Sequence, residues 1–312
     1  MGNKDRKIIL NNGINVLSLF DGISCGHVAL DRVGIMVNKY FASEICCDAI
    51  TVTQHNYPNT VQLGDVCLLD EESLKKLPKI DLLIGGSPCQ DLSKANVRKT
   101  EGLYDTKSKL FFEYIRIRDW LVKYNNPDLL FLLENVKPKH QYLEIMTRLV
   151  GVEPVMIDSA LVSAQRRLRY YWTNINGGNI KQPEDKGILI KDVVYDNNYC
   201  QFKDERIERT KIYTKNYIKY DLSGKGYYSQ QDRAYYLNGK MGTVPKNQPT
   251  NKLNIWLGGD LYRRGHPIEA ERYQTLPDNY TDCIQSFSKR IGLCGDGWTV
   301  DVIAHILEGL KE

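Results

Sequence analysis

The sequence predicts an α/β protein built on a doubly wound, mostly parallel β-sheet. From Val16 to about Asn174, short apolar runs alternate with amphipathic segments, which is the pattern of successive β-α-β units. The chain has 312 residues, of which 42% are hydrophobic and 26% charged. That length and composition suit a globular protein with one large α/β domain and a smaller one.

Each element of the large domain follows from local periodicity. Short runs rich in apolar residues predict strands at 16–20, 39–42, 61–63, 81–84, 129–133, 155–157 and 169–173. Apolar residues at helical spacing predict helices at 26–33, 47–55, 109–123 and 141–150. Because a helix separates most successive strands, we expect crossover connections between parallel strands.

The alternation ends after Asn176-Gly177-Gly178. Residues 178–264 are polar, rich in Tyr and Lys and irregular in pattern, and we expect a separate small domain there. The last segment returns to helical character and is expected to complete the first domain. The predicted organisation is therefore a large α/β domain at 1–177, a small domain at 178–264 and a segment at 265–312 that completes the large domain.

Composition excludes several classes of protein. No apolar run approaches the ~20 residues of a membrane span. The first twelve residues are polar and charged, without the apolar centre of a signal peptide. The eight cysteines lack Cys-x-x-Cys and Cys/His spacing, so neither a disulfide framework nor a bound metal is indicated. We expect a reduced, cytoplasmic protein with no membrane and no metal partner.

The net charge of +4 is unevenly distributed. Between Lys203 and Arg264 there are 13 Lys and Arg residues against 6 Asp and Glu, together with 8 of the 20 tyrosines. Basic residues interleaved with aromatic ones suit a nucleic-acid surface. A solvated small domain rich in tyrosine explains this composition equally well.

The most informative stretch is Gly85-Gly86-Ser87-Pro88-Cys89-Gln90, directly after the predicted strand at 81–84. The cysteine therefore lies just past the carboxyl end of a strand, at the edge where α/β sheets bind ligands. The glycines allow the backbone to bend and the proline makes the turn rigid. An isolated Pro-Cys pair is usually structural. The motifs around this pair favour a reactive cysteine.

A second motif follows the first predicted strand, in Phe20-Asp21-Gly22-Ile23-Ser24-Cys25-Gly26. A glycine in a strand-to-helix turn lets backbone N–H groups face a ligand, although the G-x-G-x-x-G spacing and a P-loop lysine are absent. The next two strands end in Glu44 and Asp65, which suit a ribose hydroxyl and an adenine amino group. Each acid alone is more often a capping or solvated residue. Together they favour an adenosine-type cofactor without a pyrophosphate.

Two further motifs carry charge at strand ends. Glu134 follows a wholly apolar run, which is costly unless the carboxylate is paired or functional. Burial would raise its pKa, as a proton donor requires, while a helix cap is the alternative. Gln165, Arg167 and Arg169 share one face of a predicted strand, so two guanidinium groups point the same way. Such forks recognise phosphate or a polarised carbonyl, and a solvated edge strand is the alternative.

In this order, the motifs resemble the DNA (cytosine-5) methyltransferase family. Its members carry a Phe-x-Gly turn, a Pro-Cys pair, Glu-Asn-Val and Gln-x-Arg-x-Arg, then a variable recognition region and a closing helix, and the matches here extend to about Ile306. Residues 17–23, 102–104, 110–113, 154–158 and 297–300 are similar to the eukaryotic de novo branch. That branch's N-terminal reader domains are not present, which points to a stand-alone bacterial or phage enzyme. The implied fold is a Rossmann-like class I methyltransferase sheet with a smaller target-recognition domain.

The resemblance also implies a reaction. A methyl group would pass from S-adenosyl-L-methionine to C5 of a cytosine flipped out of double-stranded DNA, through a covalent cysteine adduct. Cys89 would attack C6, Glu134 engage N3 and the amine, Arg169 bind O2, and Arg167 position Glu134 or a phosphate. The implied cofactor residues are Phe20, Asp21, Gly22, Ile23, Glu44, Ile45, Asp65, Val66, Pro88, Leu110 and Trp298. The implied DNA contacts are Ser93, Lys94, Asn96, Gln231, Arg233 and Thr243.

Some positions depart from the family pattern. Ser24 and Cys25 stand where many bacterial members have glycine, and 295–298 reads Gly-Asp-Gly-Trp instead of the usual Gly-Asn-Ser/Ala-Val. Residues Glu269, Arg272, Gln274 and Pro277 fit a family helix that we interpret as structural.

Two alternatives are a tRNA-directed enzyme of the same fold and a catalytically silent DNA-binding protein. The Lys- and Tyr-rich region and the intact set of Cys89, Glu134 and Arg169 favour an active DNA enzyme. A cognate restriction endonuclease is a candidate partner.

Overall fold

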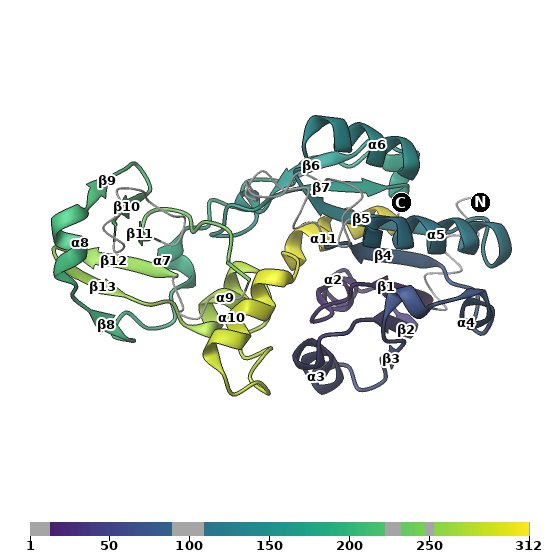
Figure 1. Ribbon diagram of the computed structural model, residues 1–312, viewed down its shortest axis with the longest axis horizontal. Coiled ribbons are helices and arrows are strands. Elements are labelled where there is room, and N and C mark those ends of the chain that lie inside the picture. The colour runs from purple at the N-terminus through teal and green to yellow at the C-terminus, as the bar shows by residue number, and fades with distance from the viewer. Residues whose placement is uncertain (1–12, 89–108, 222–231, 247–252, 312) are drawn as a thin grey trace. The chain divides into compact units, whose positions relative to one another are not determined.

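The computed structural model describes residues 13–88, 109–221, 232–246 and 253–311. The chain forms two compact units. Figure 1 shows the chain coloured by residue number. Unit 1 comprises Met1–Asp158, Leu168–Gln182 and Val302–Glu312; unit 2 comprises Ser159–Arg167 and Pro183–Asp301. These units divide the chain differently from the functional domains predicted above, whose boundaries stay predictions. Five predicted site residues lie outside the described residues: Cys89, Ser93, Lys94, Asn96 and Gln231.

Unit 1 contains a seven-stranded sheet in the order β3-β2-β1-β4-β5-β7-β6. The strands from β3 to β5 are parallel, and β7 runs antiparallel to both β5 and β6. The strands are β1 (Ile14–Leu19), β2 (Val37–Ser43), β3 (Val61–Gln62), β4 (Leu82–Gly86), β5 (Leu130–Val136), β6 (Val155–Asp158) and β7 (Leu168–Thr173). The predicted doubly wound α/β class is confirmed.

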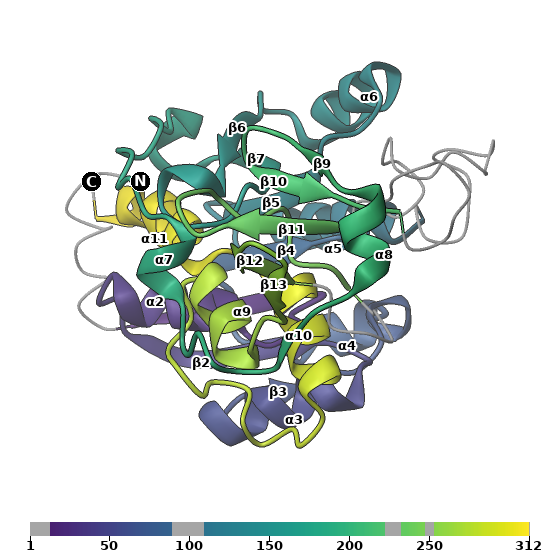
Figure 2. The ribbon, with the colours of Figure 1, turned by 90° about the vertical axis from the view of Figure 1, so that its left-hand side faces the viewer.

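The helices of unit 1 lie on both faces of this sheet, with α5 on one side of the strands and α2 on the other (Figure 2). They are α2 (Cys25–Arg32), α3 (Cys47–Asn56), α4 (Glu71–Lys75), α5 (Lys109–Tyr124) and α6 (His140–Val150), with short 3-10 turns η1 (Val66–Leu68), η4 (Ile175–Gly178) and η5 (Glu308–Leu310). Of the helices, α4 was not predicted, because five residues are too few to show helical periodicity. Its start is set locally, where the Asp70 carboxylate accepts a hydrogen bond from the Ser73 N–H at 2.8 Å.

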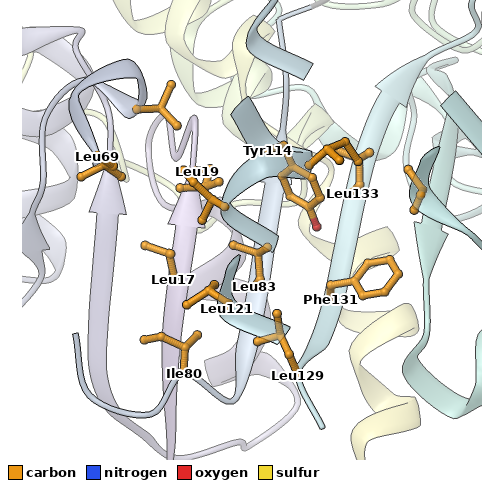
Figure 3. Close-up of a cluster of buried hydrophobic side chains, with 14 of the residues drawn as sticks. Leu17, Leu19, Leu69, Ile80, Leu83, Tyr114, Leu121, Leu129, Phe131 and Leu133 are labelled. Atoms are coloured by element: carbon orange, nitrogen blue, oxygen red, sulfur yellow. The ribbon is translucent and has the colours of Figure 1, made fainter. Parts of the chain in front are cut away.

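The main core of unit 1 lies between alternate residues of the central strands and the helices α4 to α6 (Figure 3). Leu17, Leu83 and Leu133 point into it from three adjacent parallel strands, and all three are fully buried. Tyr114 of α5 packs against β4 at Gly85, where an added Cβ would lie 3.0 Å from the ring. Gly85 is therefore needed for close packing at the end of β4.

Unit 2 contains a six-stranded sheet in the order β8-β13-β12-β11-β10-β9, in which only β11 and β12 are parallel. The strands are β8 (Gln201–Phe202), β9 (Ile212–Tyr213), β10 (Tyr217–Lys219), β11 (Arg233–Tyr236), β12 (Asn254–Gly258) and β13 (Leu261–Arg263). The sequence pattern predicted an irregular segment here, and that prediction is wrong because the segment forms a sheet. Strands of two to five residues are too short for alternation to reveal them.

The remaining helices are η3 (Ser159–Leu161), α7 (Ile190–Val193), α8 (Glu205–Thr210), α9 (Pro267–Tyr273), α10 (Phe287–Asp296) and α11 (Val300–Leu307). They include three short ones that were not predicted, η3, α7 and α8, and three in the C-terminal segment, α9 to α11. The helical character predicted for 265–312 is confirmed.

Buried polar pairs hold α9 in unit 2. The Arg263 guanidinium donates to both carboxylate oxygens of Glu269, at 3.1 and 2.6 Å, and both side chains are completely buried. The Gln274 amide oxygen accepts from Gln165 at 3.1 Å and from the Thr299 hydroxyl at 2.8 Å. These contacts support a structural role for the Glu-x-x-Arg-x-Gln motif, because removing one partner of a buried pair leaves an uncompensated charge.

Two kinds of feature are absent from the described ranges, namely a membrane-spanning helix and a metal-binding cluster. No helix there is both long and apolar enough to cross a membrane. No three His, Cys, Asp or Glu side chains in those ranges are grouped to hold a metal ion.

The core makes a first testable prediction. Leu83→Ala should lower the free energy of unfolding by about 2–5 kcal/mol, because it leaves a cavity where the side chain is fully buried. Leu68→Ala is the matched control: this leucine is 75% exposed, so the change should stay within about 0.5 kcal/mol. Urea unfolding of both variants measures the difference. Equal losses would contradict the position of the core.

Candidate active site

The strand order of unit 1 reverses between β1 and β4. The chain proceeds from β1 to β2 and β3 on one side, and from β4 to β5 on the other. Leu19 and Gly85 are register partners near the carboxyl ends of these two central strands. Such a reversal point is where open α/β sheets bind ligands. The Phe20 turn and the Ser87-Pro88 segment both follow directly from it.

The turn after β1 has an unusual backbone. Phe20, Gly22 and Ser24 all have left-handed conformations, with φ of 58°, 60° and 56°. Only glycine adopts this region without strain, and each other residue costs about 1–3 kcal/mol. Strain of this kind concentrates at ligand sites and persists only where surrounding contacts fix it.

Glu44, at the end of β2, supplies such contacts. Its Oε2 accepts a hydrogen bond from the Gly22 N–H at 2.8 Å, and its Oε1 accepts from the N–H groups of Ile45 and Cys46, both at 2.8 Å. The sequence suggested a ribose acceptor, and the structure adds that Glu44 clamps the turn. A carboxylate has about four acceptor positions, so capacity for a ligand hydroxyl is left. The neighbouring Ile45 side chain is 71% exposed and offers an apolar surface.

The other predicted cofactor residues differ in how far their side chains are exposed. Asp65 caps η1, accepting the Cys67 N–H at 2.9 Å with one carboxylate oxygen. Ile23 and Val66 bury their side chains, so only their backbones remain for contact. Pro88 is exposed, and Leu110 is partly buried against the core. Trp298 belongs to unit 2 and is half-buried.

Asp21 carries a buried carboxyl beneath the turn. Its Oδ1 accepts from the Tyr40 hydroxyl at 2.9 Å, and its Oδ2 accepts from the Ser24 hydroxyl. Burial raises the pKa of Asp21 from 3.8 to about 6, although the hydrogen bonds from Ser18, Ser24 and Tyr40 oppose the rise. Ser24, which departs from the usual glycine, therefore has a physical role as a partner of this carboxyl.

The end of β5 brings two predicted catalytic residues together. The Oε1 of Glu134 lies 2.9 Å from Nε of Arg169, on the antiparallel neighbour β7. Glu134 is only 7% exposed. Gly86 is the register partner of Glu134 on the other side, so the pair lies beside the end of β4. A charged pair shielded from water is strongly directional and suits a polar, planar ligand.

Asn135 ties β5 to the segment that leads to Cys89. Its Nδ2 donates to Ser87 Oγ at 3.0 Å and lies 3.4 Å from the Ser87 carbonyl oxygen. Both residues are buried, at 1% and 4% exposure. Asn135 belongs to the Glu-Asn-Val motif but was not among the predicted site residues. The available signal was a buried amide at a strand end, which must find a partner.

Other predicted site residues belong to unit 2. Arg167 is buried and donates to the carbonyl oxygens of Gly295 and Gly297, at 3.1 and 3.0 Å. These contacts hold the end of α10, and the role expected for Arg167 at Glu134 stays a prediction. Thr243 is exposed, and its hydroxyl donates to the Arg166 carbonyl at 2.9 Å. Arg233 is half-buried on β11.

A cavity of about 260 Å³ lies elsewhere in unit 1. It is lined by the first residues of β1, β4 and β5, including Ile14, Leu82 and Leu130. None of the predicted site residues lines it. The cavity is at the amino-terminal ends of the parallel strands, opposite the edge just described, and we assign it no role in the site.

The chain is similar in sequence to known proteins. Residues 14–141 match the C-5 cytosine-specific DNA methylase family. The chain is 30% identical over 275 residues to the orphan methyltransferase M.SPRI of Bacillus phage SPR, covering 77% of this chain and 56% of that protein. It is 40% identical over 121 residues to the DNA (cytosine-5)-methyltransferase DRM1 of Arabidopsis thaliana, covering 36% of this chain and 19% of that protein. The chain thus spans about half the length of the phage relative.

Two solved structures share the fold at low sequence identity. A mutant of DNMT2 from Spodoptera frugiperda is 18% identical with a TM-score of 0.66, covering 96% of this chain and 100% of that one. The Entamoeba histolytica methyltransferase EhMeth is 16% identical with a TM-score of 0.68, covering 96% and 98%. The region 14–141 therefore matches the C-5 cytosine-specific DNA methylase family, and the chain shares its fold with these two structures. The resemblance stated from the motifs is confirmed.

Asp21 gives a prediction of pH dependence. Its folded pKa of about 6 exceeds the ordinary 3.8, so between these values the folded protein binds more protons than the unfolded chain. The contribution of Asp21 to stability is complete below pH 3.8 and is lost as pH rises through about 6, by up to about 3 kcal/mol in all. Urea unfolding from pH 4 to 8 should therefore show wild type losing stability relative to Asp21→Asn as pH rises. A difference that is constant with pH would contradict the buried carboxyl.

Proposed function

We propose that the protein is a DNA (cytosine-5-)-methyltransferase that uses S-adenosyl-L-methionine and double-stranded DNA. The observation that carries this proposal is the end of β5, where Glu134 pairs with Arg169 and the adjacent Asn135 holds Ser87, two residues before Cys89. The family match over 14–141 and the phage and plant relatives support the same reaction.

The residues after β1 fit the proposed cofactor. The turn at Phe20–Ser24 is strained, Glu44 and Asp65 retain acceptor capacity, and Ile45 offers an exposed apolar face. An adenosine with a polar ribose and a flat base requires these groups. When bound, S-adenosyl-L-methionine supplies an electrophilic methyl group on its sulfonium. Phe20, Asp21, Gly22, Glu44, Ile45 and Asp65 would hold it.

Cytosine C5 is a poor nucleophile, and the proposed roles of the side chains correct this. The Cys89 thiolate adds to C6, which breaks the C5–C6 double bond and places the electron pair at C5. Glu134 holds a proton at N3 and contacts the exocyclic amine, while Arg169 donates to O2, so negative charge spreads over the ring. After C5 is methylated, loss of the C5 proton and departure of the thiolate restore the double bond.

This chemistry requires a base outside the helix stack. A thiolate must approach C6 from above the ring plane, and a stacked neighbour covers that face in duplex DNA. We therefore include extrusion of the target cytosine in the proposal. The low exposure of Glu134 supports it, because only a base inserted among the strand ends reaches a carboxylate that is 7% exposed.

The nucleophile gives a direct prediction. Cys89→Ala should abolish methyl transfer to duplex DNA, because no other group can add to C6 in its place. Cys200→Ala is the matched control, since this exposed thiol belongs to unit 2 and is not among the predicted site residues, and it should keep its activity. Transfer of a radioactive methyl group to DNA measures both. Activity of Cys89→Ala above a tenth of wild type would refute the covalent route, and methylation of tRNA in place of DNA would refute the proposed substrate.

Asp65, one of the proposed cofactor residues, gives another prediction. Asp65→Ala should weaken S-adenosyl-L-methionine binding by about 1–3 kcal/mol, the cost of a lost buried hydrogen bond. Asp70→Ala is a close control, because Asp70 caps α4 through the same kind of N–H contact away from the strand end. Calorimetry of both variants should show the loss only for Asp65. Equal affinities would remove Asp65 from the cofactor site.

A further inference from the structure

Unit 2 presents an arginine fixed on an aromatic ring. We propose that this residue, Arg233, determines sequence specificity by reading a guanine beside the target cytosine, while its neighbour Lys219 contacts the DNA backbone. The inference rests on the proposed function and deepens it, since it names the base that unit 2 recognises. The geometry of β10 and β11, which lie side by side in Figure 2, carries it.

The register of these two strands places four residues on one face. Tyr217 is opposite Tyr235, and Lys219 is opposite Arg233. Side chains alternate along a strand, so these four share a face. The intervening Ile218 and Ala234 point the other way, into a small core with Ile207 of α8 and with Tyr220 and Tyr262. The polar face is therefore supported from behind by packed apolar side chains.

On this face the Arg233 guanidinium is stacked. Its Cζ lies 4.6 Å from the centre of the Tyr217 ring, and the Tyr217 and Tyr235 rings are 5.3 Å apart. Stacking fixes the plane of the guanidinium and leaves its edge available for donation. An arginine held in this way loses little further entropy when it binds a planar acceptor.

Among the described residues, no carboxylate forms an ion pair with Arg233 or Lys219, the cations on this face. Arg233 Nε is buried without a hydrogen-bond partner among those residues. Because buried donors are normally satisfied, this atom indicates a missing acceptor.

Tyr235 interacts with Arg233 and with Gly242, which precedes the exposed Thr243. Burial raises the pKa of Tyr235, while hydrogen bonding with the Arg233 side chain and the Gly242 backbone opposes the rise. A Cβ at Gly242 would overlap the Tyr235 hydroxyl, so this close contact requires glycine. The following Val244 N–H donates to Gln165 Oε1 at 2.7 Å, which anchors the turn. One buried ring thus contacts both Arg233 and Gly242, the residue before Thr243.

The chemistry of the two cations differs. A guanidinium fork matches the O6 and N7 acceptors of guanine in the major groove, which is the commonest specific contact of arginine with DNA. Lysine is a point charge that suits phosphate, and phosphate contacts give affinity without sequence information. We therefore assign discrimination to Arg233 and general affinity to Lys219.

The test is methylation of duplexes with randomised bases around a cytosine, read by bisulfite sequencing. Wild type should prefer guanine at one position, and Arg233→Lys, which keeps the charge but loses the fork, should reduce that preference about five- to a hundredfold. Lys219→Ala should slow methylation of all duplexes alike and lower the salt slope of binding by about one. Tyr217→Leu should partly reproduce Arg233→Lys, whereas Tyr217→Phe, which keeps the ring, should resemble wild type.

The possible outcomes distinguish failure of the inference about Arg233 from failure of the proposed function. Methylation by wild type with no preferred guanine, or an unchanged preference in Arg233→Lys and Tyr217→Leu, would overturn the inference and leave the proposed function intact. No methylation of any duplex by wild type would overturn the proposed function itself. Thermal unfolding of each variant identifies loss of fold, and if Arg233→Lys does not fold, Tyr217→Leu against Tyr217→Phe decides alone.

Discussion

The site depends on two adjacent polar residues at the end of one apolar strand. Glu134 and Asn135 are both buried, and β5 directs them to different partners, Arg169 on β7 and Ser87 beyond β4. A buried polar group without a partner costs about 1–3 kcal/mol, and more if it is charged. The two contacts therefore define where the ends of three neighbouring strands must lie. The position of the segment leading to Cys89 follows from that constraint.

In the turn after β1, which we propose binds the cofactor, the local structure is strained. There the backbone is strained at Phe20 and Ser24, and the Asp21 carboxyl is buried at the expense of a raised pKa. Glu44 and Tyr40 hold the arrangement from β2. These local costs are sustained by the apolar packing behind the strands, such as Leu17 and Leu83. A rigid core and a strained edge are the usual conditions for a preorganised ligand site.

Sequence patterns predicted the large sheet well, because its strands are long apolar runs separated by amphipathic helices. They also predicted functional roles for Glu134, a carboxylate at the end of an apolar strand, and for Arg169. The structure pairs the two side chains, and their roles stay predictions. The small sheet was missed, because β8 to β13 are too short for periodicity. The partners of Asp21 and Arg167 were also beyond prediction. Tyr40 is 19 residues from Asp21, and Gly295 is 128 residues from Arg167, so only the tertiary fold brings them into contact.

The central claim is that Cys89, two residues after the Ser87 that Asn135 holds, forms a bond to cytosine C6. The most direct measurement is mass spectrometry of the protein after incubation with S-adenosyl-L-methionine and a duplex that contains 5-fluorocytosine. Fluorine at C5 cannot leave as a proton does, so the account predicts a stable adduct on the peptide that contains Cys89. An adduct on another residue, or methylation of an ordinary duplex without any adduct on the fluorinated one, would contradict it.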